Sequence, residues 1–257
     1  MLKQIIENKR KEVEINKIKL PLSSFKDKIV NSERDFKSAL SKNKLNLIAE
    51  FKRKSPSKNI LNNNLDIQKI ISVYNNHADA ISVLTDKEFF NGSLEDIKTV
   101  SSLTKLPILR KDFIIDEYQI YEARFYNADA ILLIASVLSL EQINHFIDVA
   151  KPLNMNCLVE VHNEEDLNKV LDSNSEIIGI NNRNLNTLEI DLNTTLNLMD
   201  KIPSDKIIVS ESGIKDSDYV NKLKTKVNAI LVGSAFMNSV NLEEDMANMV
   251  NNFHCHK

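Results

Sequence analysis

The sequence predicts a single soluble (β/α)8 barrel, an α/β fold, with a helical extension at its N-terminus. Three observations favour this fold. The chain has 257 residues, close to the roughly 250 residues of one such barrel. Short apolar runs alternate with longer stretches of helical spacing, which is typical of βα units around a parallel sheet. The apolar runs number eight, as a closed barrel of this kind requires.

The eight candidate strands are short runs rich in Ile, Val and Leu. Three of them follow Pro107, Pro152 or Pro203, each of which would end the helix before the strand. The runs lie at Leu47–Phe51, Ala80–Leu84, Ile108–Lys111, Ala130–Ile134, Cys157–Val161, Ile177–Asn181, Ile207–Ser210 and Ala229–Val232.

The stretches between these strands carry helix signals. Ser139 and Gln142 form a capping-box pattern, and an apolar face then recurs at helical spacing through Ile143, Phe146 and Ala150. A similar aromatic stripe follows the third strand. Such stripes are most simply the faces that pack against the barrel.

A segment of about forty-five residues precedes the first strand and is not needed by a minimal barrel. One helical face of this segment carries four apolar side chains: Leu2, Ile5, Ile6 and Val13. Residues 32–35 would open another helix. We expect residues 1–45 to pack on the barrel, with a frayed amphipathic arm and an interaction helix as alternatives. Residues 46–250 would form the barrel and residues 251–257 a disordered tail, so that residues 1–257 make one domain.

Charge and cysteine content limit the classes of partner and compartment. A formal net charge of -3 gives no global reason to expect nucleic acid or an anionic membrane as a partner. The two cysteines, Cys157 and Cys255, cannot be read as a disulfide framework, which favours a reducing cytoplasmic compartment. The N-terminus is too charged for a signal peptide, and no apolar run is long enough to span a bilayer. Because the chain as a whole is not basic, any phosphate site must be formed by a local group of residues.

Polar side chains gather at the predicted carboxyl ends of the strands, where parallel barrels build their active sites. They are Glu50, Lys52, Lys111, Glu160, Asn181, Arg183 and Glu211. Because side chains alternate across a strand, Glu50 shares a face with Lys52, and Asn181 shares one with Arg183. A single charge there could be a solvated strand end, but several that converge on one mouth indicate a functional site.

Lys111 and Glu160 are predicted to face each other across this mouth. They would supply a proton donor and a proton acceptor whose pKa values are set by burial and by each other. A structural ion pair is the alternative interpretation of these two positions. The other charges expected in the same mouth favour acid-base chemistry.

A phosphate site is predicted at the loops after the last two strands. The chain has only four glycines, and Gly213 and Gly233 occupy these loops, where the backbone N–H groups of a cradle need close approach. Ser234 follows directly. Ser55 and Pro56 begin a cationic, turn-rich loop after the first strand, suited to close over an anion, although Ser-Pro is also a common helix start.

Seven blocks of sequence stand out in order along the chain. The first is IAEFKRKSPS at residues 48–57. The others are TDKEFFNGS (85–93), PILRKDF (107–113), LVEV (158–161), GINNRNL (179–185), SESG (210–213) and LVGS (231–234). Together they resemble the blocks of the indole-3-glycerol phosphate synthase family, whose first signature reads I-A-E-x-K-x-x-S-P-S. The resemblance covers essentially the whole chain, including the N-terminal extension.

The resemblance implies a defined reaction with no metal or organic cofactor. The anilino sugar phosphate 1-(2-carboxyphenylamino)-1-deoxyribulose 5-phosphate would close a pyrrole ring, losing carbon dioxide and water to give indole-3-glycerol phosphate in tryptophan biosynthesis. Lys111 would be the general acid that protonates the ribulose carbonyl, and Glu160 would transfer a proton in the later dehydration. Lys52 would meet a carboxylate or phosphate of the substrate, or supply a second acid.

The resemblance also implies the remaining site residues. It assigns catalytic support to Glu50, Asn181 and Glu211, substrate contacts to Ser55, Pro56, Phe90, Phe113, Leu132, Arg183, Leu185 and Ser212, and the phosphate cradle to Gly213, Gly233 and Ser234. The apolar residues among the substrate contacts would form the lining for the anthranilate ring of the substrate. One departure is Asn59, where the family usually has glycine; asparagine tolerates the left-handed region, so this change concerns the mobility of the loop rather than the reaction.

Two alternative functions stay open at the level of the sequence. Another phosphate-binding barrel, such as a phosphoribosyl anthranilate isomerase or a tryptophan synthase alpha subunit, would share the cradle but would not need Lys111 together with the Ser-Pro-Ser loop. A barrel without catalysis, serving as a partner subunit, has no use for several charges in a desolvated mouth. We expect a monomer, and leave open an association with other tryptophan-pathway enzymes.

Overall fold

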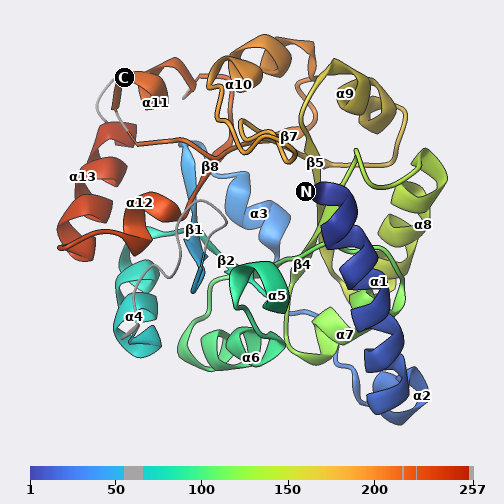
Figure 1. Ribbon diagram of the computed structural model, residues 1–257. Coiled ribbons are helices and arrows are strands. Elements are labelled where there is room, and N and C mark those ends of the chain that lie inside the picture. The colour runs from blue at the N-terminus through green and yellow to red at the C-terminus, as the bar shows by residue number, and fades with distance from the viewer. Residues whose placement is uncertain (55–65, 216, 224, 255–257) are drawn as a thin grey trace.

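The computed structural model describes residues 1–54, 66–215, 217–223 and 225–254, and in these ranges eight parallel strands close into a TIM barrel (Figure 1). The strands follow chain order around the barrel, and β1 pairs with β8 to close it. They are β1 (Asn46–Phe51), β2 (Ala80–Leu84), β3 (Ile108–Lys111), β4 (Ala130–Ile134), β5 (Asn156–Val161), β6 (Ile177–Asn181), β7 (Ile207–Glu211) and β8 (Ala229–Val232). All eight predicted strands are confirmed, each end within one residue.

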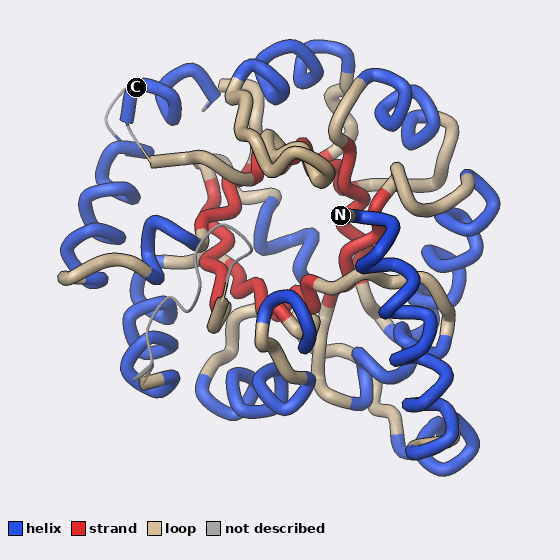
Figure 2. Tube along the Cα trace, in the orientation of Figure 1, coloured by secondary structure: helices blue, strands red, loops and turns tan. Residues whose placement is uncertain are grey.

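Helices surround the ring of strands on its outer side (Figure 2). The outer helices are α4 (Ile67–His77), α6 (Leu94–Leu103), α7 (Tyr118–Phe125), α8 (Leu140–Ala150), α9 (Glu164–Leu171), α10 (Asn193–Leu198), α11 (Ser217–Leu223) and α13 (Leu242–His254). Short helices are α5 (Lys87–Phe90), α12 (Ser234–Met237) and the 3-10 turns η1 (Lys26–Lys28), η2 (Lys151–Leu153) and η3 (Met199–Lys201). Three helices precede β1: α1 (Leu2–Lys19), α2 (Leu22–Phe25) and α3 (Phe36–Leu40).

Two separate apolar cores explain why the strands read as continuous apolar runs. Side chains that point outward, such as Leu47 and Val159, pack under the helices. Side chains that point inward, such as Ile48 and Leu158, fill the barrel. Because both faces are buried, neither face needs polar residues until the strand ends. The capping box of Ser139 at the start of α8 is present as predicted.

The N-terminal extension packs on the barrel at both of its ends. Phe36 and Leu40 of α3 belong to the interior core, and the Asn46 side chain at the start of β1 donates a 2.9 Å hydrogen bond to the Leu40 carbonyl. α3 therefore closes the end of the barrel where the strands begin. α1 runs outward from beside the opposite opening (Figure 1), and its Ile5 packs with Phe113.

A buried lysine fastens α1 to the mouth of the barrel. Lys9 is 0% exposed, and its Nζ lies 2.9 Å from Asp86 Oδ2 and 2.9 Å from Asp112 Oδ1. Burial disfavours the ammonium, but these carboxylates outweigh it and hold the pKa of Lys9 above its usual value. Asp112 also accepts from Arg110 at 3.1 Å and follows Lys111 directly in the chain. One network of charges thus connects α1 with the end of β3.

Two segments that the sequence singled out, the C-terminal tail and the loop after β1, differ from the prediction or lie outside the described residues. Residues 251–254 form the last turn of α13, in place of the disordered tail predicted for residues 251–257, because the helix continues to His254. Residues 255–257 lie outside the description, as does the loop with Ser55, Pro56 and Asn59. Among the residues that the structure describes, no helix combines the length and the apolar character needed to cross a membrane.

We predict that Lys9→Met destabilises the fold by about 3–5 kcal/mol, because it takes the lysine counter-charge from buried Asp86 and leaves buried Asp112 with Arg110 alone. The measurement is urea-induced unfolding at neutral pH. The matched control is Lys11→Met, on the exposed side of the same helix, which should stay within about 0.5 kcal/mol of the parent. Equal stabilities of the two variants would contradict the importance of this network.

Candidate active site

A cavity of about 370 Å³ opens at the carboxyl ends of the strands. Its lining includes every predicted site residue that lies in the described ranges: Glu50, Lys52, Phe90, Lys111, Phe113, Leu132, Glu160, Asn181, Arg183, Leu185, Glu211, Ser212, Gly213, Gly233 and Ser234. Ser55 and Pro56 fall outside those ranges. The structure therefore brings together at one mouth residues that come from strands around the whole barrel.

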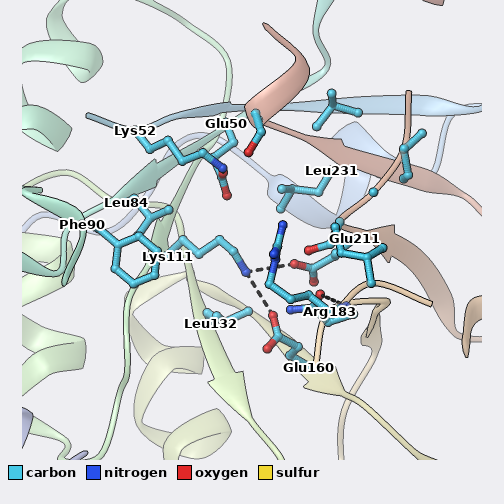
Figure 3. Close-up of a pocket in the computed structure, with 18 of the residues that line it drawn as sticks. Glu50, Lys52, Leu84, Phe90, Lys111, Leu132, Glu160, Arg183, Glu211 and Leu231 are labelled. Atoms are coloured by element: carbon cyan, nitrogen blue, oxygen red, sulfur yellow. Dashed lines mark hydrogen bonds and ion pairs between the residues drawn. The ribbon is translucent and has the colours of Figure 1, made fainter. Parts of the chain in front are cut away.

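Lys111 lies at the centre of the charged side of this cavity (Figure 3). Its Nζ is 3.0 Å from Glu160 Oε2 and 2.9 Å from Glu211 Oε2. Lys111 and Glu211 end β3 and β7, Glu160 is the second-last residue of β5, and each points inward because of the alternation along its strand. The sequence predicted the approach of Lys111 and Glu160; Glu211 completes the cluster as a second carboxylate on the same ammonium.

The charges in this cluster set one another's protonation. Burial opposes the ammonium of Lys111, but Glu160 and Glu211 outweigh burial and hold its pKa above the usual range. Burial likewise opposes the carboxylate of Glu160, and here the attraction of Lys111 wins and holds the pKa well below its usual value. Both groups are therefore charged at neutral pH, despite being removed from water.

Glu211 titrates differently from Glu160. Burial raises the pKa of its carboxyl to about 7; the attraction of Lys111 opposes this shift, and repulsion from Glu160 adds to it. Near neutral pH, one carboxyl beside Lys111 is ionised and the other is partly protonated. Two carboxyls whose proton affinities are separated in this way can take different roles in one reaction.

Two glycines leave room for the carboxylates of the mouth. A Cβ at Gly179 would lie 2.3 Å from Glu211 Oε1, and a Cβ at Gly233 would lie 2.2 Å from Glu50 Oε1. Any side chain at either position would therefore displace a charged group. The sequence placed Gly233 in a phosphate cradle and gave Gly179 no role. The only signal for this contact was the scarcity of glycine in the chain.

A second ion pair lies on the other side of the cavity. Lys52 Nζ is 2.6 Å from Glu50 Oε1, and both side chains are buried at the end of β1. Arg183 is half-buried and donates a 3.0 Å hydrogen bond to the Leu188 carbonyl. Lys52 and Arg183 give the cavity two further cations for anionic groups of a ligand.

The loops after β7 and β8 form one wall of the cavity. Ser212 and Gly213 are consecutive residues in the left-handed region, with φ of 66° and 80°. Such a conformation costs energy at a serine, and strain of this kind clusters at functional sites. Lys215 and Asn238 also line the cavity beside these loops. They were missed because a lysine and an asparagine in surface loops carry no signal in the sequence.

Apolar side chains form the opposite wall. Phe90 ends the short helix α5 after β2, Phe113 comes from the loop after β3, and Leu132 comes from β4. Leu84 and Leu231, which the sequence did not single out, also line the cavity (Figure 3). Their signal was the inward alternation of their strands. The cavity thus has an apolar side, suited to a flat ring, and a charged side.

Comparisons with known proteins agree on one family. The family described as "Indole-3-glycerol phosphate synthase" matches residues 2–249. The indole-3-glycerol phosphate synthase of Endomicrobium trichonymphae is 45% identical over 242 residues, which covers 91% of this chain and 93% of that protein. That of Acetivibrio thermocellus is 44% identical over 251 residues, 95% of this chain and 96% of the relative.

A second group of relatives is longer than this chain. The "Tryptophan biosynthesis protein TrpCF" of Buchnera aphidicola subsp. Acyrthosiphon pisum is 46% identical over 249 residues, which are 97% of this chain but 55% of that protein. The chain thus spans about half the length of these relatives and nearly the full length of the others. On the family match and on these identities, the chain belongs to the indole-3-glycerol phosphate synthase family.

Proposed function

We propose that this chain is a carboxy-lyase that converts 1-(2-carboxyphenylamino)-1-deoxyribulose 5-phosphate to indole-3-glycerol phosphate in tryptophan biosynthesis. The observation that carries the proposal is the buried ammonium of Lys111, held between two carboxyl groups of different proton affinity. Ring closure places negative charge on a carbonyl oxygen, which a cationic acid can stabilise and protonate.

Lys111 is proposed as the general acid of ring closure. Its ammonium faces the cavity and would donate a proton to the ribulose carbonyl oxygen as the new carbon–carbon bond forms. Glu211 lies 2.9 Å from Lys111 Nζ and, with a pKa of about 7, carries a proton that it can return to the lysine. Loss of carbon dioxide then restores the aromatic ring.

Glu160 is proposed to act in the dehydration that follows. Its carboxylate is ionised at neutral pH and lies 3.0 Å from Lys111 Nζ, so it can exchange a proton with the intermediate beside the same lysine. Lys52 would bind a carboxylate or phosphate of the substrate or supply a second acid. Glu50 and Asn181 would orient the catalytic groups and the sugar hydroxyls.

The two walls of the cavity suggest how the substrate is oriented. The anthranilate ring would lie against the apolar side, where Phe90, Phe113, Leu132 and Leu185 line the cavity. Arg183 and Ser212 would add polar contacts. The phosphate would lie at the loops of Gly213, Gly233 and Ser234, beside the cation of Lys215.

We also propose a setting for the enzyme. Cys157 is free and buried, which suits a reducing cytoplasm. A barrel whose mouth is built from one chain needs no second copy to complete its site, which supports a monomer. The longer TrpCF relatives support an association with another tryptophan-pathway activity.

The purified chain should convert the anilino sugar phosphate to an indole product without added metal. The product is followed by its fluorescence, with release of carbon dioxide as a second readout. Carbon dioxide and indole should appear in equal amounts. No fluorescent product at saturating substrate would refute the proposed function.

Replacing the proposed general acid should abolish most of the activity. Lys111→Ala is expected to lower the rate at least ~100-fold, because no other ammonium replaces it between the two carboxylates. Lys105→Ala, at an exposed lysine shortly before β3, is the matched control and should retain the parent rate. Activity of Lys111→Ala within a few-fold of the control would assign the acid to another residue.

The protonation of Glu211 should appear in the pH profile. Below its pKa of about 7 the neutral carboxyl leaves Lys111 with one anionic neighbour, which makes the ammonium a stronger acid. We therefore expect kcat/KM to decline as the pH rises through about 7. Glu211→Gln, which stays neutral, should remove this limb. A limb that persists unchanged in the variant would belong to the substrate or to another group.

A further inference from the structure

An imidazole lies on the side of Glu160 that faces away from Lys111. His162 follows the end of β5, and its Nε2 is 3.1 Å from Glu160 Oε1, while Glu160 Oε2 is 3.0 Å from Lys111 Nζ. Each oxygen of this carboxylate therefore has its own cationic partner. His162 is not among the site residues that the sequence predicted.

A second carboxylate holds the imidazole from behind. Asp166 of α9 has its Oδ2 3.6 Å from His162 Nδ1, and the same oxygen accepts a 3.1 Å hydrogen bond from the His162 backbone N–H. The Asp166 backbone N–H in turn donates to the Asn163 side chain at the start of α9. The first turn of the helix thus fixes Asp166, which lies within ion-pair distance of the ring.

The charges around this pair favour an imidazolium. The ring faces two carboxylates, Glu160 and Asp166, and its side chain is only 11% exposed. Burial opposes the charged ring, but the two carboxylates outweigh burial and raise the pKa of His162 to about 9. Around Glu160, on its other side, lie Lys111, Glu211 and, farther along the mouth, Glu50. His162 is therefore cationic at neutral pH.

We infer that His162 is a positioning residue for the proposed reaction: its imidazolium, oriented by Asp166, holds one oxygen of Glu160 so that the other faces Lys111 and the cavity. His162 is not one of the residues that line the cavity, and its ring reaches the cavity through Glu160. The placement of His162 beside Glu160 rests on the distances between their side chains, whereas its effect on turnover rests on the proposed function.

This arrangement has a consequence for the two carboxyl groups beside Lys111. The imidazolium opposes protonation of Glu160, and no comparable cation faces Glu211 within the described residues other than Lys111. His162 therefore helps to direct the shared proton to Glu211 and to keep Glu160 ionised. Without the imidazolium, Glu160 would become more basic, and it would be protonated at a higher pH.

A first experiment tests the pairing without using activity. The ring of His162 is titrated by NMR in the substrate-free protein, where a pKa of about 9 is expected. Glu160→Gln and Asp166→Asn should each lower this pKa, because each removes one of the two anions. A ring that titrates near the usual ~6.5, or that does not respond to either variant, would overturn the inference whether or not the chain is an enzyme.

A second experiment tests the effect on catalysis. His162→Gln keeps a polar side chain but removes the charge; we expect kcat to fall about 10- to 100-fold with little change in KM. In the pH profile of kcat, the decline on the acidic side should move to higher pH as Glu160 becomes more basic. His145→Gln is the matched control, since this exposed histidine also pairs with a carboxylate, Glu117, at 3.0 Å.

The outcomes separate the two proposals. A parent enzyme that makes no indole product refutes the proposed function, and the NMR titration then still decides the pairing. A parent enzyme that is active, with a His162→Gln pH profile identical to that of His145→Gln, refutes the positioning role alone. If His162→Gln does not fold, Asp166→Asn carries the kinetic test, with a smaller shift of the same limb expected.

Discussion

The site depends on one interaction, the contact of the Lys111 ammonium with the two buried carboxyl groups of Glu160 and Glu211. A charge removed from water is tolerated only when its partners are close and well oriented. Closure of the barrel provides this by bringing the ends of β3, β5 and β7 to one mouth. Gly179 then leaves the space that Glu211 occupies, and His162 holds Glu160 from behind. Chemistry at this mouth is therefore inseparable from the ion pairs that stabilise it.

The fold and the residues that form the site could both be predicted from the sequence, for related physical reasons. Strands buried on both faces are mostly apolar, so charged side chains stand out near their ends, as at Glu50 or Lys111. Inward alternation then predicts which of those charges share the mouth. The contact of Lys111 with Glu160 follows from these two rules, and both side chains indeed lie at that mouth.

Other features could not be predicted, because they depend on three-dimensional geometry that the sequence pattern does not show. The contacts of Gly179 with Glu211 and of Gly233 with Glu50 require distances that no local pattern encodes. His162 lacked a recognisable partner because Asp166 meets it only through the geometry of a helix start.

Lys9 carries a consequence for the order of assembly. α1 precedes β2 and β3 in the chain, yet Asp86 and Asp112, which pair with its buried lysine, belong to the segments that follow those strands. Until those strands exist, burying this lysine would leave it with Glu12 of its own helix as its partner, at 3.0 Å, so the helix gains little by docking early. We therefore expect α1 to stay undocked and exposed to solvent until a later part of the polypeptide has been synthesised. Translation of β3 would supply the last of its partners.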